Sequence, residues 1–178
     1  MNNGWIEIIC GPMFCGKTEE LIRRLKRALI AKKNVSIFKP LIDDRYSTNH
    51  IVSHNNNSIE SKSVKNINEI LEYSKKSDVI GIDEAQFFNN DIINLSNQLA
   101  NRGKRIIIAG LDKDYLGEPF GPISHLLSKA EYITKLYAIC VKCGEKAFFS
   151  KRITEDSKQV IVGEKDKYEA RCRSCFIN

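Results

Sequence analysis

The sequence predicts an α/β protein with a mostly parallel sheet covered by helices on both faces, followed by a small metal-organised unit. Three observations support this. Short Ile- and Val-rich runs alternate with segments of helical spacing, a glycine-rich motif follows the first run, and four cysteines form two Cys-x-x-Cys pairs near the C-terminus. With 178 residues, the chain has room for one ordinary domain and a small appendage.

The expected strands are four short apolar runs, mostly bounded by Gly, Asp or Pro: 5–10, 35–39, 79–83 and 105–109. The expected helices lie between and after them, where apolar residues recur at helical spacing. Their stripes are Leu21, Leu25, Ala28 and Leu29; Ile67, Ile70 and Leu71; and Ile92, Leu95 and Leu99. Asn89 or Asn90 is placed to cap the third helix, and Gly103 lies just past its end.

Two regions interrupt the alternation of strands and helices. Residues 43–63 are polar, with three consecutive asparagines, which predicts a long loop or a hairpin. From Cys140 onward the helical pattern stops. We therefore expect a nucleotide-binding α/β domain over 1–138 and a zinc-binding domain over 139–178.

Composition and charge narrow the class of protein. The net charge of +6 suits polyanionic ligands such as nucleotides without requiring nucleic acid. No apolar run approaches the ~20 residues of a membrane span, and the N-terminus leaves no room for a signal peptide. Paired Cys-x-x-Cys motifs in that setting indicate metal binding rather than disulfides. We expect a cytoplasmic protein with no membrane partner.

The glycine-rich motif matches the phosphate-loop pattern G-x-x-x-x-G-K-S/T between an expected strand and an expected helix. Its backbone N–H groups and the helix N-terminus are suited to cradle phosphates, with Lys17 on the β- and γ-phosphates and the Thr18 hydroxyl on Mg²⁺. The alternative is a plain strand-to-helix turn. The residues of the motif are Gly11, Pro12, Met13, Phe14, Cys15, Gly16, Lys17 and Thr18.

The run 79–83 ends in two acids, the position of the metal-orienting aspartate in phosphate-loop proteins. Asp83 is the candidate for that role. Glu84 could polarise a water, as in an NTPase, or a substrate hydroxyl, as in a kinase. The tetrapeptide 83–86 also resembles the D-E-x-x box of helicases, although those enzymes normally need two such domains. The basic residues of the first helix favour a solvated face over a nucleotide contact: Arg23, Arg24, Lys26 and Arg27.

The two Cys-x-x-Cys pairs are separated by 28 residues and can supply four thiolates to one tetrahedral Zn²⁺. Four thiolates leave no open position for water, so we expect a structural rather than a catalytic metal. The ligands would be Cys140, Cys143, Cys172 and Cys175. Four reduced core cysteines are the alternative. Of the remaining two, Cys10 is expected to be a core thiol.

Taken together, these residues resemble the thymidine kinase family over essentially the whole chain. The markers are the phosphate loop at 11–18, Asp-x-Arg-Tyr at 43–46, Gly-Ile-Asp-Glu-x-Gln-Phe-Phe at 81–88, Gly-Leu-Asp at 110–112, Pro-Phe-Gly at 119–121 and the cysteine pairs. The resemblance implies a RecA-like phosphate-loop domain with a small zinc domain bearing a lasso loop. It also implies transfer of the γ-phosphate of ATP to the 5′-hydroxyl of thymidine.

The resemblance assigns roles residue by residue. Glu84, Lys17 and Arg45 are the implied catalytic residues, with Glu84 as the base. Asp43 and Arg45 match residues near the transferred phosphate and metal, and Gln86 joins the ATP and Mg²⁺ group. The implied thymidine pocket comprises Met13, Leu111, Tyr115, Phe120, Ser150, Ile161, Gly163 and Tyr168.

The family also implies a homotetramer and feedback inhibition by dTTP. Two other function classes stay open from the residues alone. A single-domain DNA-dependent ATPase would use the same phosphate loop and acids, and a zinc-ribbon nucleic-acid-binding module would account for the charge and the cysteines. The thymidine kinase expectation, with no nucleic-acid partner, uses all of these motifs together.

Overall fold

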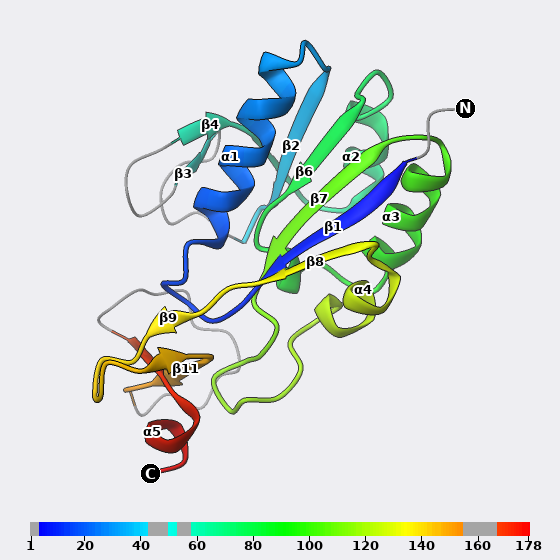
Figure 1. Cartoon of the computed structure of the whole chain (residues 1–178). Coiled ribbons are helices and arrows are strands. Elements are labelled where there is room, and N and C mark those ends of the chain that lie inside the picture. The colour runs from blue at the N-terminus through cyan, green and yellow to red at the C-terminus, as the bar shows by residue number, and fades with distance from the viewer. Residues whose placement is uncertain (1–3, 43–49, 53–57, 155–166) are drawn as a thin grey trace.

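The computed structural model describes residues 4–42, 50–52, 58–154 and 167–178. Its centre is a six-stranded sheet in the order β5-β2-β6-β7-β1-β8, and all neighbouring strands are parallel (Figure 1). The expected parallel α/β architecture is confirmed. The strands of this sheet are β1 (Trp5–Cys10), β2 (Val35–Pro40), β5 (Lys62–Val64), β6 (Val79–Ile82), β7 (Arg105–Gly110) and β8 (Tyr132–Lys135).

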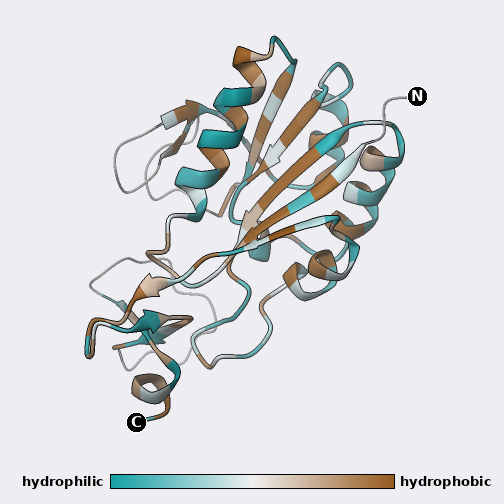
Figure 2. Ribbon diagram, in the orientation of Figure 1, coloured by the Kyte–Doolittle hydropathy of each residue, from teal (hydrophilic) through white to brown (hydrophobic). Residues whose placement is uncertain are grey.

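Helices cover both faces of the sheet. α1 (Lys17–Ile30) lies on one face, and α2 (Ile67–Tyr73), α3 (Asp91–Asn101) and α4 (Ile123–Lys129) lie on the other (Figure 1). Side chains alternate between the faces along each strand. In β7, Ile106 and Ile108 pack in the core beneath α3, whereas Ile107 packs beneath α1. The strands are accordingly the most continuously hydrophobic ribbons in Figure 2.

Two elements of the sheet were not expected from the sequence. β8 lies at one edge, where Tyr132 and Ile133 are 60% and 53% exposed, so it lacks the apolar pattern of a buried strand. β5 lies at the other edge and overlaps the end of the segment 43–63 that was expected to be a loop or hairpin. The hairpin itself is present, because β3 (His50–Val52) and β4 (Ser58–Glu60) pair antiparallel.

The helix predictions need one correction. Leu29 was expected on the core stripe of α1 but is 47% exposed, because that stripe runs through Leu21, Ile22, Leu25 and Ala28 instead. At the start of α3, the side-chain Oδ1 of Asn89 accepts a hydrogen bond from the Asp91 N–H at 3.2 Å, so Asn89 supplies the capping bond. Asn90 occupies the cap position without a side-chain capping bond. Gly103 has φ of 82°, as its position past the helix end requires.

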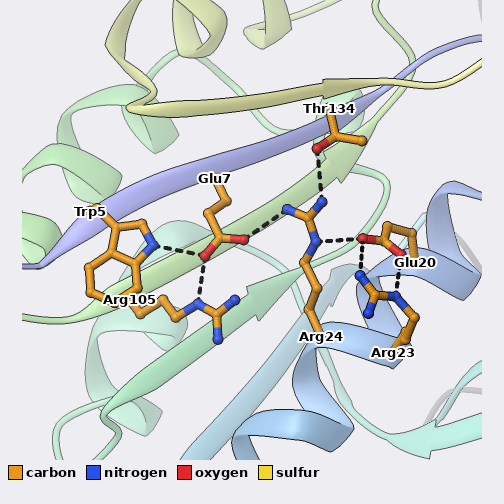
Figure 3. A network of polar contacts seen from close by, with 7 residues as sticks. All are labelled: Trp5, Glu7, Glu20, Arg23, Arg24, Arg105 and Thr134. Atoms are coloured by element: carbon orange, nitrogen blue, oxygen red, sulfur yellow. Dashed lines mark hydrogen bonds and ion pairs between the residues drawn. The ribbon is translucent and has the colours of Figure 1, made fainter.

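A partly buried ionic network holds α1 to the sheet, as Figure 3 shows. The Glu7 carboxylate, on β1, accepts hydrogen bonds from Arg24 of α1 at 2.8 Å and from Arg105 of β7 at 2.6 Å. Arg24 also donates to Glu20 and to Thr134 of β8. The expectation of a solvated basic face therefore fails for Arg24, whose side chain is only 14% exposed.

The C-terminal part carries two small antiparallel pairs below the main sheet (Figure 1). β9 (Ala138–Ile139) pairs with β10 (Lys146–Ala147), and β11 (Phe149–Arg152) pairs with β12 (Tyr168–Arg171). A short helix, α5 (Arg173–Ile177), follows, which corrects the expectation that helical structure ends before Cys140. Within the described ranges, no helix is long and apolar enough to cross a lipid bilayer.

Candidate active site

The phosphate-loop motif joins the carboxyl end of β1 to the first turn of α1, at the edge where parallel sheets bind ligands. Gly16 is the N-cap of α1 with φ of 84°, and Phe14 also has a left-handed backbone with φ of 65°. Such backbone conformations turn successive N–H groups inward to form an anion-binding concavity. Lys17, the first residue of α1, donates from Nζ to the Pro12 carbonyl at 2.7 Å.

Asp83 lies directly after β6 and is 4% exposed. Its backbone N–H donates to the Phe38 carbonyl of β2 at 2.9 Å, which fixes the end of the strand. Its Oδ2 accepts a hydrogen bond from the Thr18 hydroxyl at 3.0 Å. The two side chains that sequence reasoning assigned to Mg²⁺ therefore meet, although 65 residues separate them.

Glu84 has a left-handed backbone, with φ of 50°, at the start of the 3₁₀ turn η1 (Ala85–Phe87). Its N–H donates to Asp83 Oδ1 at 3.0 Å, and its Oε2 accepts from the Gln86 side-chain amide at 2.5 Å. A non-glycine residue in this region costs about 1–3 kcal/mol and is concentrated at functional sites. The turn thus holds a carboxylate in a defined orientation next to the Thr18–Asp83 pair.

Gln86 links this carboxylate to the expected thymidine pocket. It is 3% exposed, and while its amide nitrogen holds Glu84, its Oε1 accepts from the Leu111 N–H at 3.0 Å. Phe120 lies nearby against Phe87, with ring centroids 5.8 Å apart in an edge-on arrangement. Sequence reasoning placed Gln86 with ATP and Mg²⁺, whereas its side chain hydrogen-bonds to Glu84 and to the backbone of Leu111.

Two more of the expected pocket residues meet through an arginine that sequence reasoning missed. The guanidinium of Arg152 lies 3.6 Å from the ring centroid of Tyr115 and donates to the Tyr168 hydroxyl at 2.8 Å. Cation–π contact with one ring and a hydrogen bond to the other fix both aromatic side chains. Arg152 lies only two residues after Ser150 on the same strand, β11. This spacing is the sequence feature that could have identified Arg152 as a pocket residue.

Ser150 contacts the phosphate loop instead of standing free in the pocket. Its side chain, 4% exposed, accepts a hydrogen bond from the Met13 N–H at 2.9 Å. Its hydroxyl proton remains available to an acceptor. Of the other site residues expected from sequence, Asp43, Arg45, Ile161 and Gly163 lie outside the described residues.

Further ionisable groups lie at the same end of the sheet. Asp112 follows β7 and pairs with Lys135 at 2.7 Å and Lys113 at 3.3 Å. Burial raises the pKa of Asp112, but the bond to Lys135 and the charge of Lys113 outweigh it and hold that pKa below its ordinary value. Burial raises the pKa of Cys10 to about 11 and also raises the pKa of Cys15, so both stay protonated thiols. Cys10 is fully buried, as expected for a core thiol.

The four cysteines of the two pairs converge. Their sulfur atoms all lie within 4.8 Å of one another, and the sulfurs of Cys143 and Cys172 are 3.6 Å apart. Four sulfurs bound to one Zn²⁺ at ~2.3 Å would be about 3.8 Å apart, so the cluster is compatible with a structural zinc site. Cys172 is also the N-cap of α5, where its sulfur accepts from the Cys175 N–H.

A cavity of about 620 Å³ opens at the opposite end of the sheet, lined in part by Trp5, Arg27, Val79 and Arg105. These residues stand at or near the amino ends of strands, whereas the phosphate loop and the acids follow carboxyl ends. The cavity is therefore separate from the candidate active site.

Comparison with known proteins agrees with this geometry. A family model described as thymidine kinase matches residues 4–176. A thymidine kinase of a Rhodothermus species is 52% identical over 173 residues, covering 97% of this chain and 81% of that protein. One of Bacteroides fragilis is 54% identical over 173 residues, covering 97% and 87%. The flagellar accessory protein FlaH of Methanocaldococcus jannaschii is similar in fold alone, with a TM-score of 0.55, 14% identity, and coverage of 82% of this chain and 76% of that one.

Proposed function

Since the chain belongs to the thymidine kinase family, and so transfers the γ-phosphate of ATP to the 5′-hydroxyl of thymidine, we propose how its own residues perform that reaction. Phosphoryl transfer depends on positioning the reactants and on stabilising charge on the phosphate oxygens. The proposal therefore gives each residue of the carboxyl edge one of three tasks. These tasks are binding the phosphates, accepting the proton of the nucleoside hydroxyl, and holding the thymine base.

The phosphate loop from Gly11 to Thr18 binds the triphosphate. Lys17 exchanges its bond to the Pro12 carbonyl for the β- and γ-phosphate oxygens, where a cation offsets developing charge. Thr18 and Asp83 hold Mg²⁺, which supplies further charge neutralisation when bound. The pair fits the ion, because a hydroxyl and a carboxylate oxygen already face each other at 3.0 Å.

Glu84 is the general base that accepts the proton of the 5′-hydroxyl. The observation that carries this assignment is the Gln86–Glu84 hydrogen bond of 2.5 Å, on a turn whose backbone is bound to Asp83. Gln86 acts as a positioning residue, because its other end binds the backbone at Leu111 on the nucleoside side. The side-chain amide of Gln86 thus holds both the Glu84 carboxylate and the backbone of the nucleoside pocket. By family analogy, Asp43 and Arg45 act beside the transferred phosphate.

The thymine base lies among Met13, Leu111, Tyr115, Phe120 and Tyr168, with the Ser150 hydroxyl and the backbone at Ile161 and Gly163 as hydrogen-bonding groups. The Arg152 contacts support the aromatic part of this assignment, because they fix Tyr115 and Tyr168 in place. Backbone recognition of the base by the lasso loop tolerates changes in its side chains.

The remaining proposals concern the whole protein. The four cysteines hold one structural Zn²⁺, and the division at residues 138 and 139 separates the nucleotide-binding domain from the zinc-binding domain. The protein acts in the cytoplasm on free nucleosides, without a nucleic-acid or membrane partner. A homotetramer and feedback inhibition by dTTP follow from the family resemblance.

Nucleoside-dependent ADP release tests the proposal. Thymidine should stimulate ADP formation from Mg²⁺ and ATP, and polynucleotides should not. Other nucleosides serve as controls for the pocket. Stimulation by single-stranded DNA with no response to thymidine would instead support a DNA-dependent ATPase.

A further inference from the structure

The phosphate loop is built against the four-cysteine part of the chain. The Met13 N–H, in the middle of the loop, donates to the Ser150 hydroxyl of β11 at 2.9 Å. Ser150 is 4% exposed, and the bond is partly buried. The backbone amide of Met13, which belongs to the anion-binding loop, is therefore held by the Ser150 side chain, 137 residues further along the chain.

An apolar cluster joins the same two regions. The next loop residues, Phe14 and Cys15, pack against a small core made of Ala138, Cys140, Ala147 and Ala170. Cys172 and Cys175 pack against that core as well. Three of the four metal-ligand cysteines, Cys140, Cys172 and Cys175, therefore share one apolar cluster with two phosphate-loop side chains.

A continuous run of backbone contacts leads from Ser150 to the metal ligands. In the β11–β12 ladder, Ser150 is paired with Ala170. The Ala170 carbonyl accepts from the N–H of Val141, which lies inside the first Cys-x-x-Cys turn, at 3.1 Å. Ala170 also stands two residues before Cys172. The strand that holds Ser150 in place is thus fixed on both cysteine pairs.

The start of the phosphate loop contacts the residue that follows β8. The Leu136 N–H, just before β9, donates to the Cys10 carbonyl at 2.8 Å. Gly11 follows with φ of 145°, and a Cβ there would lie 2.4 Å from the Leu136 carbonyl oxygen. Only glycine permits this close approach. The beginning of the phosphate loop is therefore held by the residue that follows β8, and its middle is held by Ser150 of β11.

We propose that the four-cysteine module positions the phosphate loop through Ser150, so that zinc occupancy and Mg²⁺·ATP binding are coupled. Ser150 is a positioning residue in this role, separate from any contact with thymine. The inference rests on the zinc assignment made above. Coupling between two binding equilibria is reciprocal, so zinc should tighten nucleotide binding and nucleotide should tighten zinc binding by one common factor.

The test measures both equilibria on the full-length protein in the absence of thymidine. Calorimetry gives the Kd of Mg²⁺ with a non-hydrolysable ATP analogue, and competition with a chromophoric chelator gives the Kd of zinc with and without that analogue. Ser150→Ala removes the acceptor for Met13, and Ser150→Thr keeps it. Ser128→Ala is the matched control, because the exposed Ser128 hydroxyl on α4 donates to the nearby His125 carbonyl, away from the phosphate loop.

In the wild-type protein the analogue should lower the Kd of zinc several-fold. Ser150→Ala should raise the Kd of the analogue roughly two- to tenfold, the effect of one lost hydrogen bond, and should diminish the zinc effect. Ser150→Thr and Ser128→Ala should match the wild type. A zinc Kd that does not respond to the analogue, or an unchanged analogue Kd in Ser150→Ala, would overturn the coupling while leaving the zinc site intact. A purified protein without zinc would overturn both.

Discussion

The Thr18 hydroxyl donates a 3.0 Å hydrogen bond to Oδ2 of Asp83, joining the first turn of α1 to the end of β6. The second oxygen of the same carboxylate is bound by the Glu84 N–H. Asp83 therefore organises both the proposed metal site and the turn that carries the proposed base. Removing the charge of Asp83 should therefore weaken the binding of Mg²⁺·ATP.

Lys17→Ala should lower thymidine phosphorylation by about 10²-fold or more, because one cation is lost from the phosphate oxygens in the transition state. Lys26→Ala is the control, since Lys26 is exposed on the same helix. Steady-state kinetics and thermal unfolding should show lost turnover with an unchanged melting temperature. Near-normal turnover of Lys17→Ala would refute the phosphate-loop assignment.

Glu84→Gln is nearly isosteric but cannot accept a proton at neutral pH. As the general base, Glu84 should contribute about 10²–10⁴-fold, so kcat should fall by that range with the KM of ATP little changed. Asp83→Asn should instead raise the KM of Mg²⁺·ATP, because it weakens the metal site. Indistinguishable kinetic profiles for the two variants would show that Glu84 only supports the metal.

The purified protein should contain one Zn²⁺ per chain, measurable by elemental analysis. Cys140→Ser or Cys172→Ser should lose the zinc and thymidine binding together, because ligand binding and local folding form one equilibrium at such sites. Cys15→Ser is the matched control, since Cys15 is not among the four converging sulfurs, and it should keep the metal. Native protein with no zinc would contradict the assignment.

Glu7→Gln should destabilise the fold by about 3 kcal/mol at pH 7, because a buried network loses its central charge. Burial raises the pKa of Glu7, yet hydrogen bonds from Arg105, Trp5 and Arg24 bring that pKa below 4.5. A lowered folded-state pKa stabilises the protein above the unfolded value, and this is lost as the pH falls through the folded pKa. The difference in the free energy of unfolding between Glu7→Gln and the wild type should therefore shrink below about pH 4.5.

Urea denaturation at pH 7 and at pH 4 measures this difference, and Glu72→Gln on the exposed side of α2 is the control. A constant difference in the free energy of unfolding across that range would show that Glu7 contributes through shape and packing instead of charge.

The sequence alone was sufficient to predict the elements that a short, local pattern of residues encodes. Short apolar runs predicted β1, β2, β6 and β7, and the phosphate-loop and cysteine motifs predicted which residues converge. The edge strands were missed because exposed strands lack a continuous apolar pattern, as Tyr132 and Ile133 of β8 illustrate.

The contacts that escaped prediction are those made across long separations in the chain. The bond from Met13 to Ser150 and the packing of Arg152 on Tyr115 depend on how the C-terminal part folds back, which no local pattern encodes. Leu29 was misplaced for a related reason. The helical stripe could be read from the sequence, but the extent of the sheet beneath the last turn of α1 could not.

The strand order has a consequence for biosynthesis. β1 is made first, yet both of its neighbours, β7 and β8, begin only at residues 105 and 132. At ribosomal rates the isoleucine-rich first strand waits roughly 5–20 s before a pairing partner exists. During that interval it is an unpaired, aggregation-prone segment within reach of chaperones. Two contacts that hold the phosphate loop, from Leu136 to Cys10 and from Met13 to Ser150, likewise become possible only after residues 136 and 150 have been made.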